Sequence, residues 1–160
     1  MVDFILTEEQ AALKELCRNF GEQQLQPIAD ELDKKAGEDP EGPFPWGVLK
    51  EFSSLGLKNL PLPEKWGGAD MGVLTHCVLL EEFMAAEAGF AAAVHQSWKL
   101  AGLIAECGTE EQVSKYIPIF SQDDTFLMGD GTLGPISSPE DLRLAATREG
   151  SGWVIDGNKR

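Results

Sequence analysis

The spacing of apolar residues changes from helical to alternating near residue 120, and this change constrains the fold more than any other feature of the sequence. One helix face is indicated by the i, i+3, i+4, i+7 spacing of Leu13, Leu16, Cys17 and Phe20. Within 142–157, by contrast, apolar and polar residues alternate as they do along a half-buried strand. We therefore expect a mainly α protein, in which an N-terminal bundle of about five helices is followed by a truncated β-sheet segment.

Two copies of the stretch TEEQ, at 7–10 and 109–112, predict where two of these helices begin. In each copy a Thr can accept a hydrogen bond from a free backbone N–H, while a Gln three residues later reaches back, which makes a capping box. The two carboxylates between them favour the positive end of a helix. The flanking residues differ, so we interpret the echo as a shared need for capping rather than as a duplicated unit.

The other helix boundaries follow from proline, glycine and the apolar pattern. We expect a long first helix that is kinked at Pro27, because proline removes a backbone donor, and that ends near Gly37. Further helices are predicted from Pro45 to Gly56, from Val73 to a break at Gly89, over 90–107 and over 110–120. The prolines and paired glycines of 59–72 predict an ordered turn with Trp66 as its anchor.

Strands are expected only towards the end of the chain. The stretch DTFLMG, 124–129, is predicted to be a strand, and 142–157 to contain two β-like runs around a Gly-rich turn. A sheet of two or three strands that stops at GNKR has little to pack against. We therefore divide the chain into a helical domain, 1–121, and the incomplete beginning of a β domain, 122–160.

The charge balance excludes two classes of partner. With 27 acidic and 13 basic residues the net charge is −14, which repels nucleic acid and anionic lipid. No apolar run approaches the ~20 residues that a membrane helix needs, and the start MVDFILTEEQ has no basic region followed by a long apolar one. We expect a cytoplasmic protein that binds no nucleic acid and inserts into no membrane.

The cysteines and histidines do not predict a metal site. Cys17, Cys77 and Cys107 are odd in number and far apart, and each lies in an apolar helical pattern, so we expect buried, inert thiols. His76 and His95 are 19 residues apart, which is neither a helical nor a zinc-ligand spacing.

The stretch GDGTLG at 129–134 admits two interpretations. It fits Gly-x-Gly-x-x-Gly after a predicted strand, and Asp156 ends a later β-like run, as in a dinucleotide-binding fingerprint. That site needs helix amides facing a pyrophosphate, but Pro135 and Pro139 supply no amide donor. We favour a Gly/Pro-rich surface loop, since five helices precede the first strand instead of alternating with strands.

Six ordered stretches carry a resemblance to a known family: FILTEEQAALKELCRNF, LQPIADELDK, LKEFSSLGLKNLPLPEKWGGADMG, LLEEFMAAEAG, ECGTEEQVSKYIPIF and WVIDGNKR. The fifth resembles the G-T-E-E-Q-K-x-K-Y-L-P signature of the acyl-CoA dehydrogenase family of flavoproteins almost letter for letter. The sixth resembles a segment on a strand of that family's middle β domain. The resemblance covers nearly the whole chain.

This resemblance implies a helical domain, a middle β domain and a C-terminal four-helix domain, with FAD and an acyl-CoA substrate held where they meet. In the family a carboxylate of the C-terminal domain removes the α-proton, and the flavin N5 accepts a hydride from the β-carbon. No residue of this chain matches that base, so we assign no catalytic residue and expect the chain alone to be inactive. The resemblance also implies homo- or hetero-oligomers with dehydrogenase subunits, and electron-transfer flavoprotein as the acceptor.

By the same resemblance, 126–136 corresponds to the loop that contacts the flavin through backbone and hydroxyl groups. The cofactor-binding candidates are Phe126, Met128, Gly129 and Gly134. Glycine stands at 129 where threonine is expected, and Pro-Ile replaces Ser-Asp at 135–136. Because glycine and proline lack those hydroxyls, FAD would be held differently here, or not by this chain.

The stretch AAAVHQSWKLAGLIAEC, 91–107, resembles the family helix that borders the acyl chain. The substrate-pocket candidates on it are Val94, His95, Ser97 and Trp98. The alternative is that Val94 and Trp98 pack in the core and His95 is partly exposed. If Trp98 faces the pocket, its bulk would shorten the acyl chain accepted.

Two other interpretations stay open. The altered flavin loop and the missing base favour a non-catalytic, degenerate subunit or interaction module that pairs with a complete dehydrogenase partner. The end at GNKR favours a fragment of a longer enzyme, because natural chains seldom stop inside a sheet whose edge is uncovered.

Overall fold

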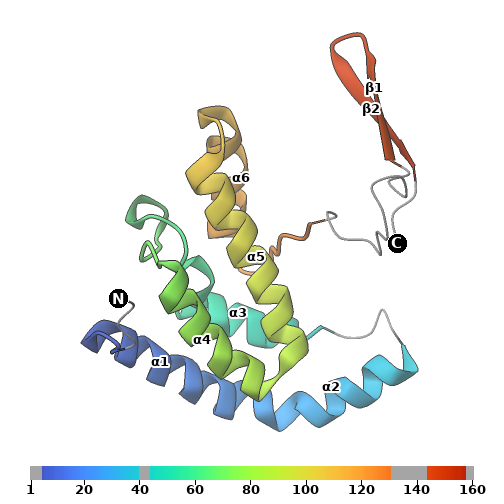
Figure 1. The fold of residues 1–160 in the computed structure, drawn as a ribbon. Coiled ribbons are helices and arrows are strands. Elements are labelled where there is room, and N and C mark those ends of the chain that lie inside the picture. The colour runs from blue at the N-terminus through green and yellow to red at the C-terminus, as the bar shows by residue number, and fades with distance from the viewer. Residues whose placement is uncertain (1–4, 40–43, 131–143, 158–160) are drawn as a thin grey trace. The chain divides into compact units, whose positions relative to one another are not determined.

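Helices make up most of the chain, and a β-hairpin follows them (Figure 1). The structure is a computed structural model that describes residues 5–39, 44–130 and 144–157. It consists of two units, Met1–Gly129 and Asp130–Arg160. The predicted fold class is confirmed, because within these described ranges five helical segments precede a two-stranded sheet when the long first helix is counted once.

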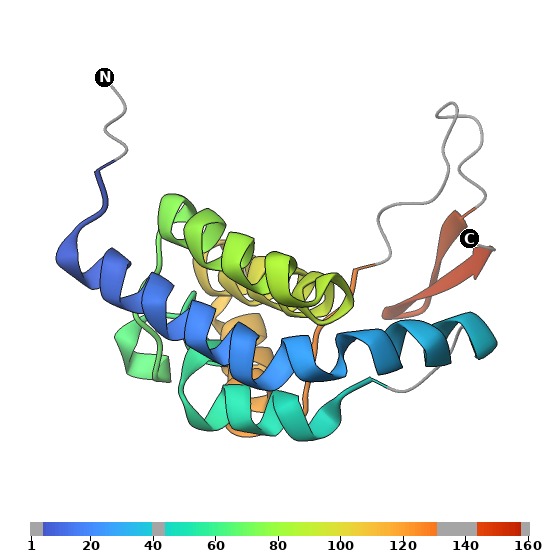
Figure 2. The ribbon, with the colours of Figure 1, turned by 90° about the horizontal axis from the view of Figure 1, so that it is seen from below.

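The first helix runs as α1 (Glu8–Phe20), a π-helical turn η1 (Gly21–Leu25) and α2 (Gln26–Glu38), which form one continuous rod in Figure 2. The predicted capping box opens it: the amide of Gln10 donates to Thr7 Oγ1 over 3.1 Å, and the amide of Thr7 donates to Gln10 Oε1 over 3.0 Å. The distortion expected at Pro27 takes the form of this π turn, which ends before the proline. Pro27 then lies in the first turn of α2, where a missing N–H is tolerated.

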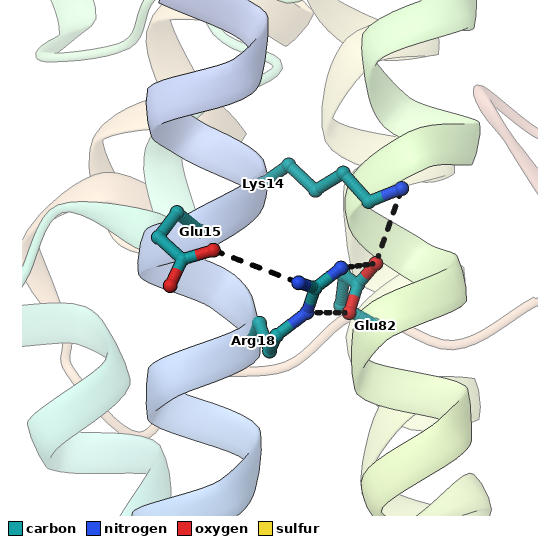
Figure 3. A network of polar contacts seen from close by, with 4 residues as sticks. All are labelled: Lys14, Glu15, Arg18 and Glu82. Carbon is teal, nitrogen blue, oxygen red and sulfur yellow. Dashed lines mark hydrogen bonds and ion pairs between the residues drawn. The ribbon is translucent and has the colours of Figure 1, made fainter.

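Close packing and an ion-pair network join α1 to α4 (Val73–Ala86). A Cβ on Gly21 would lie 2.9 Å from Ala86 Cβ, so glycine allows the close approach. In Figure 3 the carboxylate of Glu82 accepts hydrogen bonds from Arg18 Nε over 3.0 Å and from Arg18 Nη2 over 3.2 Å. Lys14 Nζ lies 3.4 Å from the same carboxylate.

Short turns connect α3 (Trp46–Ser54) to α4, namely the 3-10 segments η2 (Leu57–Asn59) and η3 (Glu64–Trp66). The ordered turn predicted over 59–72 is present, because backbone amides of 69–71 donate to the carbonyls of Leu60 and Leu62. A Cβ on Gly68 would lie 1.9 Å from Leu62 O, so only glycine fits there. Trp66 is half-buried, and the fully buried Leu62 is the deeper anchor.

The break between α4 and α5 (Ala88–Cys107) lies at Glu87 rather than at Gly89, which corrects the prediction. The carboxylate of Glu87 accepts hydrogen bonds from the amide of Gly89 over 2.9 Å and from that of Phe90 over 2.5 Å. An N-cap that satisfies two free amides starts the helix before the glycine is reached.

The last helix, α6 (Glu110–Gln122), begins at the second predicted capping box. The amide of Gln112 donates to Thr109 Oγ1 over 3.3 Å, and the amide of Thr109 donates to Gln112 Oε1 over 2.9 Å. Both occurrences of TEEQ therefore have the same local geometry.

Only one of the three cysteines is buried, so the expectation of three buried thiols was wrong for two of them. Cys17 is fully buried, and burial, with a smaller contribution from Glu82, raises the pKa of its thiol to about 12. Cys77 and Cys107 are exposed. In a helix that is apolar over most of its girth, the sequence pattern does not reveal which side faces the core.

Two hydrophobic clusters are formed by the described residues of the helical unit. The main core consists of Cys17, Phe20, Leu25, Leu49, Phe52, Leu57, Leu60, Leu79, Phe83, Phe90, Ala91, Val94 and Trp98, and the second core of Leu62, Ala101, Ile117 and Phe120. Helix α5 contributes to both clusters, since Trp98 lies in one and Ala101 in the other. It is therefore the element that fixes the position of the candidate site.

The strand predicted at 124–129 is not formed, which is a third correction. A strand requires a neighbouring strand, whereas the backbone of this segment bonds to side chains of the helical unit. Ser53 Oγ donates to Asp124 O over 2.8 Å, and Ser97 Oγ contacts the backbone of Met128.

The second unit contains an antiparallel hairpin of β1 (Leu144–Glu149) and β2 (Gly152–Gly157), which confirms the two β-like runs. Ala146 pairs with Ile155, and Gly150, at φ 61°, makes the turn. Strand β2 is exposed along its whole length. This antiparallel pairing differs from the parallel strand–helix–strand unit of a dinucleotide-binding fingerprint. The residues of this chain that follow the first two positions of GDGTLG, 131–143, lie outside the described part of the chain.

Candidate functional site

A groove with a volume of about 860 Å³ lies along the N-terminal half of α4 and the C-terminal half of α5. Its lining is mixed, with apolar side chains and several charged or titratable groups. The residues that line it are Pro61, Pro63, Asp70, Met71, Gly72, Val73, His76, His95, Trp98, Lys99, Gly102, Leu103, Ala105 and Glu106. A groove of this size and composition can hold a small organic ligand with a polar end.

A histidine pair spans the two helices inside this groove. His76 Nε2 and His95 Nδ1 are 3.1 Å apart, so one ring donates a hydrogen bond to the other. Burial, and then repulsion from His95, lower the pKa of His76. The edge of the His76 ring meets the Trp98 ring at 5.0 Å between centroids. His76 is therefore a neutral, polar side chain beside an aromatic one at neutral pH.

Sequence reasoning missed this pair because the spacing of 19 residues matches no single helix. One signal was present: the two histidines lie 11 residues before and 8 residues after Glu87 (87 − 76 = 11 and 95 − 87 = 8), where the chain turns. Residues at roughly equal distances from a helix–helix turn face each other in an antiparallel pair.

The four substrate-pocket candidates lie in three environments. His95 and Trp98 line the groove, whereas Val94 packs in the main core. Trp98 also packs in the main core with 1% of its surface exposed, and its indole Nε1 donates to Lys58 O over 3.1 Å. Ser97 is fully buried and contacts the backbone of Met128. Their roles toward a substrate stay predictions.

The flavin-segment candidates meet α5 through Ser97. Its Oγ accepts a hydrogen bond from Met128 N over 2.9 Å and donates to Met128 O over 3.2 Å. The side chains of Phe126 and Met128 are partly buried against the second core, and Gly129 is exposed. Gly134 lies outside the described residues. Neighbouring residues of α5 thus hold the segment predicted to contact a cofactor and line the groove.

Lys58 is a buried side chain whose structural role sequence reasoning missed. It is 2% exposed, and its Nζ donates to Phe120 O over 2.5 Å and to Asp123 O. Burial lowers the pKa of Lys58, opposed by Asp124 and Asp123. A lysine inside the apolar stretch LGLKNLPL was the available signal, because lysine is almost never fully buried unless paired. Lys58 satisfies carbonyls at the end of α6 and holds the segment that follows it.

The described part of the chain fits a flavin in one respect and departs in another. Around an ideal Cβ on Gly129 no atom lies within 4 Å, so the backbone there is open to a planar group. Among the described residues, no hydrogen-bond partner occupies the backbone groups of Leu127 and Gly129. The hydroxyl expected at 129 is missing, so the fit depends on these backbone groups.

The described part of the chain shows neither a metal-binding cluster nor a membrane-spanning helix. Over 5–39, 44–130 and 144–157, no group of three or more His, Cys, Asp or Glu side chains is arranged to hold a metal ion. Among the helices that the structure describes, none is both long and apolar enough to cross a membrane.

Comparisons with known proteins agree with the sequence resemblance. The family model described as acyl-CoA dehydrogenase, N-terminal domain, matches residues 7–123. The chain is 30% identical over 163 residues to the short-chain specific acyl-CoA dehydrogenase of Clostridium acetobutylicum, which covers 99% of this chain and 41% of that protein. It is 33% identical over 159 residues to the mitochondrial short-chain specific acyl-CoA dehydrogenase of Rattus norvegicus, which covers 96% and 36%.

A solved structure shares the fold. The chain superimposes with a TM-score of 0.82 and 25% identity on a structure described as the electron transferring flavoprotein of Acidaminococcus fermentans, over 99% of this chain and 40% of that one. The chain thus spans about two fifths of the length of these proteins.

Proposed function

The chain belongs to the acyl-CoA dehydrogenase family, and from this we propose that it forms the N-terminal part of an enzyme that dehydrogenates acyl-CoA thioesters with FAD. The reaction removes a proton from Cα and a hydride from Cβ of the thioester. When bound, the flavin supplies the two-electron chemistry by accepting that hydride. We assign the base to no residue of this chain, since none of its carboxylates lies in a region that resembles the catalytic domain.

One observation carries the proposal: adjacent residues of α5 serve the two parts of such a site. Ser97 holds the segment of Met128, which the family resemblance places beside the flavin. Trp98 lines the groove of about 860 Å³. A cofactor segment and a substrate groove on the same helix turn fit a reaction in which hydride passes directly between thioester and flavin.

The same groove supports a short acyl chain as the substrate. The bulky Trp98 is locked in place by its hydrogen bond to Lys58 O and by packing against Phe52 and Phe83. A locked indole ends a groove more firmly than a mobile aliphatic side chain does. The two curated relatives described above are named as short-chain specific enzymes. We propose butyryl-sized rather than long acyl groups.

The histidine pair would face the polar end of the ligand. An imidazole N–H of His76 or His95 can donate to a carbonyl oxygen. Lys99 lines the same groove and can attract a phosphate-bearing ligand. In this arrangement the chain orients a thioester and excludes water, and it takes no part in proton removal.

The reduced cofactor would pass its electrons to an electron-transferring flavoprotein. The likeness to the Acidaminococcus fermentans structure supports this partner for the complete protein. Assembly with other dehydrogenase subunits, identical or not, is part of the same proposal.

The test is a visible absorption spectrum of the purified 160-residue chain, alone and after reconstitution with FAD. A flavin spectrum that stays with the protein through gel filtration supports the cofactor role. The chain-length proposal is tested with Trp98→Phe, which opens the groove while keeping an aromatic ring in the core. In the protein with bound flavin, this variant should move the preference of substrate-analogue binding towards longer acyl chains.

A second candidate function is a non-catalytic subunit that pairs with a complete dehydrogenase. The glycine at 129, in place of the expected hydroxyl, favours it. So do the exposed apolar side chains of the hairpin, Trp153 at 65% and Ile155 at 72% exposure. A colourless chain that forms a defined complex with a flavin-containing dehydrogenase would select this candidate over the first.

A further inference from the structure

We propose that Ser97 is a positioning residue for the flavin segment, because its hydroxyl engages both backbone groups of Met128 and directs those of Leu127 and Gly129 to the cofactor. This inference rests on the proposed function. The family resemblance expects a threonine hydroxyl at 129 to help bind the flavin, and glycine lacks it. We assign part of that role to Ser97, a buried serine of α5 that holds the flavin segment in place.

The geometry of the contact is complete and internal. Ser97 is fully buried, and its Oγ accepts from Met128 N over 2.9 Å while donating to Met128 O over 3.2 Å. A hydroxyl carries one donor and two acceptor positions, so this bond pair uses it in both directions. Since N–H and C=O of one residue reach the same atom, both point towards α5.

The neighbours of Met128 therefore point their backbone groups elsewhere, because successive residues of extended backbone alternate in direction. The side chains agree with this alternation. Phe126 and Met128 pack against the second core, and Leu127 packs against the main core. Within the described residues, the backbone groups of Leu127 and Gly129 have no hydrogen-bond partner. They are the donors and acceptors left for a planar heterocycle.

Other tethers act further back along the chain. Ser53 Oγ donates to Asp124 O over 2.8 Å, Lys58 Nζ donates to Phe120 O and Asp123 O, and Asn59 Nδ2 donates to Ser121 O over 3.2 Å. All three act on residues 120–124. Among the described residues, Ser97 makes the side-chain hydrogen bonds that act on 127–129, so a change at Ser97 should affect that part most.

The experiment compares Ser97→Ala and Ser97→Thr with the unmodified 160-residue chain. The control is Ser114→Ala, which removes a helix serine whose hydroxyl bonds within its own helix to Glu110 O. The first readout is amide hydrogen exchange at Met128 without cofactor. The second is FAD affinity, together with the position of the bound-flavin absorption band.

We expect Ser97→Ala to exchange the Met128 amide at least tenfold faster and to bind FAD about tenfold more weakly, the effect of one neutral hydrogen bond. Its flavin band should move towards that of free FAD. Ser97→Thr keeps the hydroxyl and should restore both readouts, and Ser114→Ala should match the unmodified chain. If Ser97→Ala does not fold, Ser97→Cys takes its place, because a thiol of similar size is a weaker donor and acceptor.

The outcomes distinguish a failure of the positioning role of Ser97 from a failure of the proposed flavin binding. Should the unmodified chain bind FAD and Ser97→Ala bind it equally well with the same band, the positioning role of Ser97 is overturned and the proposed function stands. Should the unmodified chain bind no FAD, the proposed function fails and the flavin role of Ser97 fails with it. In that case the exchange readout still shows whether the serine holds Met128.

Discussion

Replacing Lys58 with methionine tests how the end of α6 is held. Methionine fills much of the same space but carries no charge and no donor, so Phe120 O and Asp123 O lose the ammonium. Asp123 O keeps the amide of Phe126, which donates to it over 3.1 Å. Phe120 O loses the charged donor that the structure gives it. The change therefore leaves Phe120 O poorly satisfied and removes one of the two hydrogen bonds that Asp123 O accepts.

The magnitude follows from these two carbonyls. A hydrogen bond to a charged group contributes about 1.5–3 kcal/mol, and an unsatisfied buried acceptor costs about 1–3 kcal/mol. Removing the ammonium also removes its own desolvation penalty, which has lowered the pKa of Lys58. We expect a net loss of about 2 kcal/mol in the free energy of unfolding.

Urea unfolding followed by far-UV circular dichroism measures this loss. Lys50→Met is the matched control, because Lys50 is exposed on α3 and its replacement should stay within about 0.5 kcal/mol of the parent chain. A second experiment measures the free energy of unfolding of both chains as a function of pH. The pKa of Lys58 is lowered in the folded state, so the unfolded chain binds the proton more tightly. The stability of the parent should therefore rise relative to Lys58→Met as the pH approaches the unfolded value of 10.5.

If Lys58→Met and Lys50→Met unfold at the same urea concentration, the bonds to Phe120 O and Asp123 O contribute nothing net. In that event Lys58 does not hold the segment after α6, and the argument from its burial is refuted.

Three further predictions concern single side chains. Glu82→Gln should destabilise the chain by about 1 kcal/mol at neutral pH, because it breaks the charged pairing with Arg18. The hydrogen bond from Arg18 lowers the pKa of Glu82, so this stabilisation is present above pH 4.5 and is lost as pH falls through the folded value below it. The lowered pKa of His76 means that the unfolded chain binds its proton more tightly, so thermal stability should fall as pH drops below about 6.5, and His76→Gln should flatten that dependence. Thr109→Ala removes an N-cap and should lower the free energy of unfolding by about 1 kcal/mol in urea titrations.

Specific results would contradict each of these. Glu15→Gln removes an exposed partner that lies 3.7 Å from Arg18, and an equal effect from it would show that Glu82 has no special role. A pH dependence that persists unchanged in His76→Gln would assign it to another group. A Thr109→Ala chain as stable as its parent would mean that Gln112 alone is enough to start α6.

Local signals in the sequence were enough for most of the secondary structure. Both capping boxes formed as expected, because Thr7 and Gln10, like Thr109 and Gln112, are only three residues apart. The hairpin formed because alternation and a glycine turn act over a few residues. The family was evident from ordered stretches alone, which the match over 7–123 bears out.

Predictions failed where a competing local interaction or a distant partner decided the outcome. The break expected at Gly89 lies at Glu87 because a carboxylate caps the amides of the next helix. The strand expected over 124–129 did not form because the side chains of Ser53 and Ser97 bond to backbone groups there. Neither serine is close in sequence to the segment that it holds.

The sequence by itself determined the mainly helical class, the helix starts and the hairpin, because these depend on atoms within a few residues of one another. Only the tertiary structure decided that His76 meets His95, that Lys58 meets Phe120 and that Ser97 meets Met128. These pairs are 19, 62 and 31 residues apart. Such contacts exist only after α4, α5 and α6 have packed, since the burial of their shared apolar faces is what brings the polar groups together.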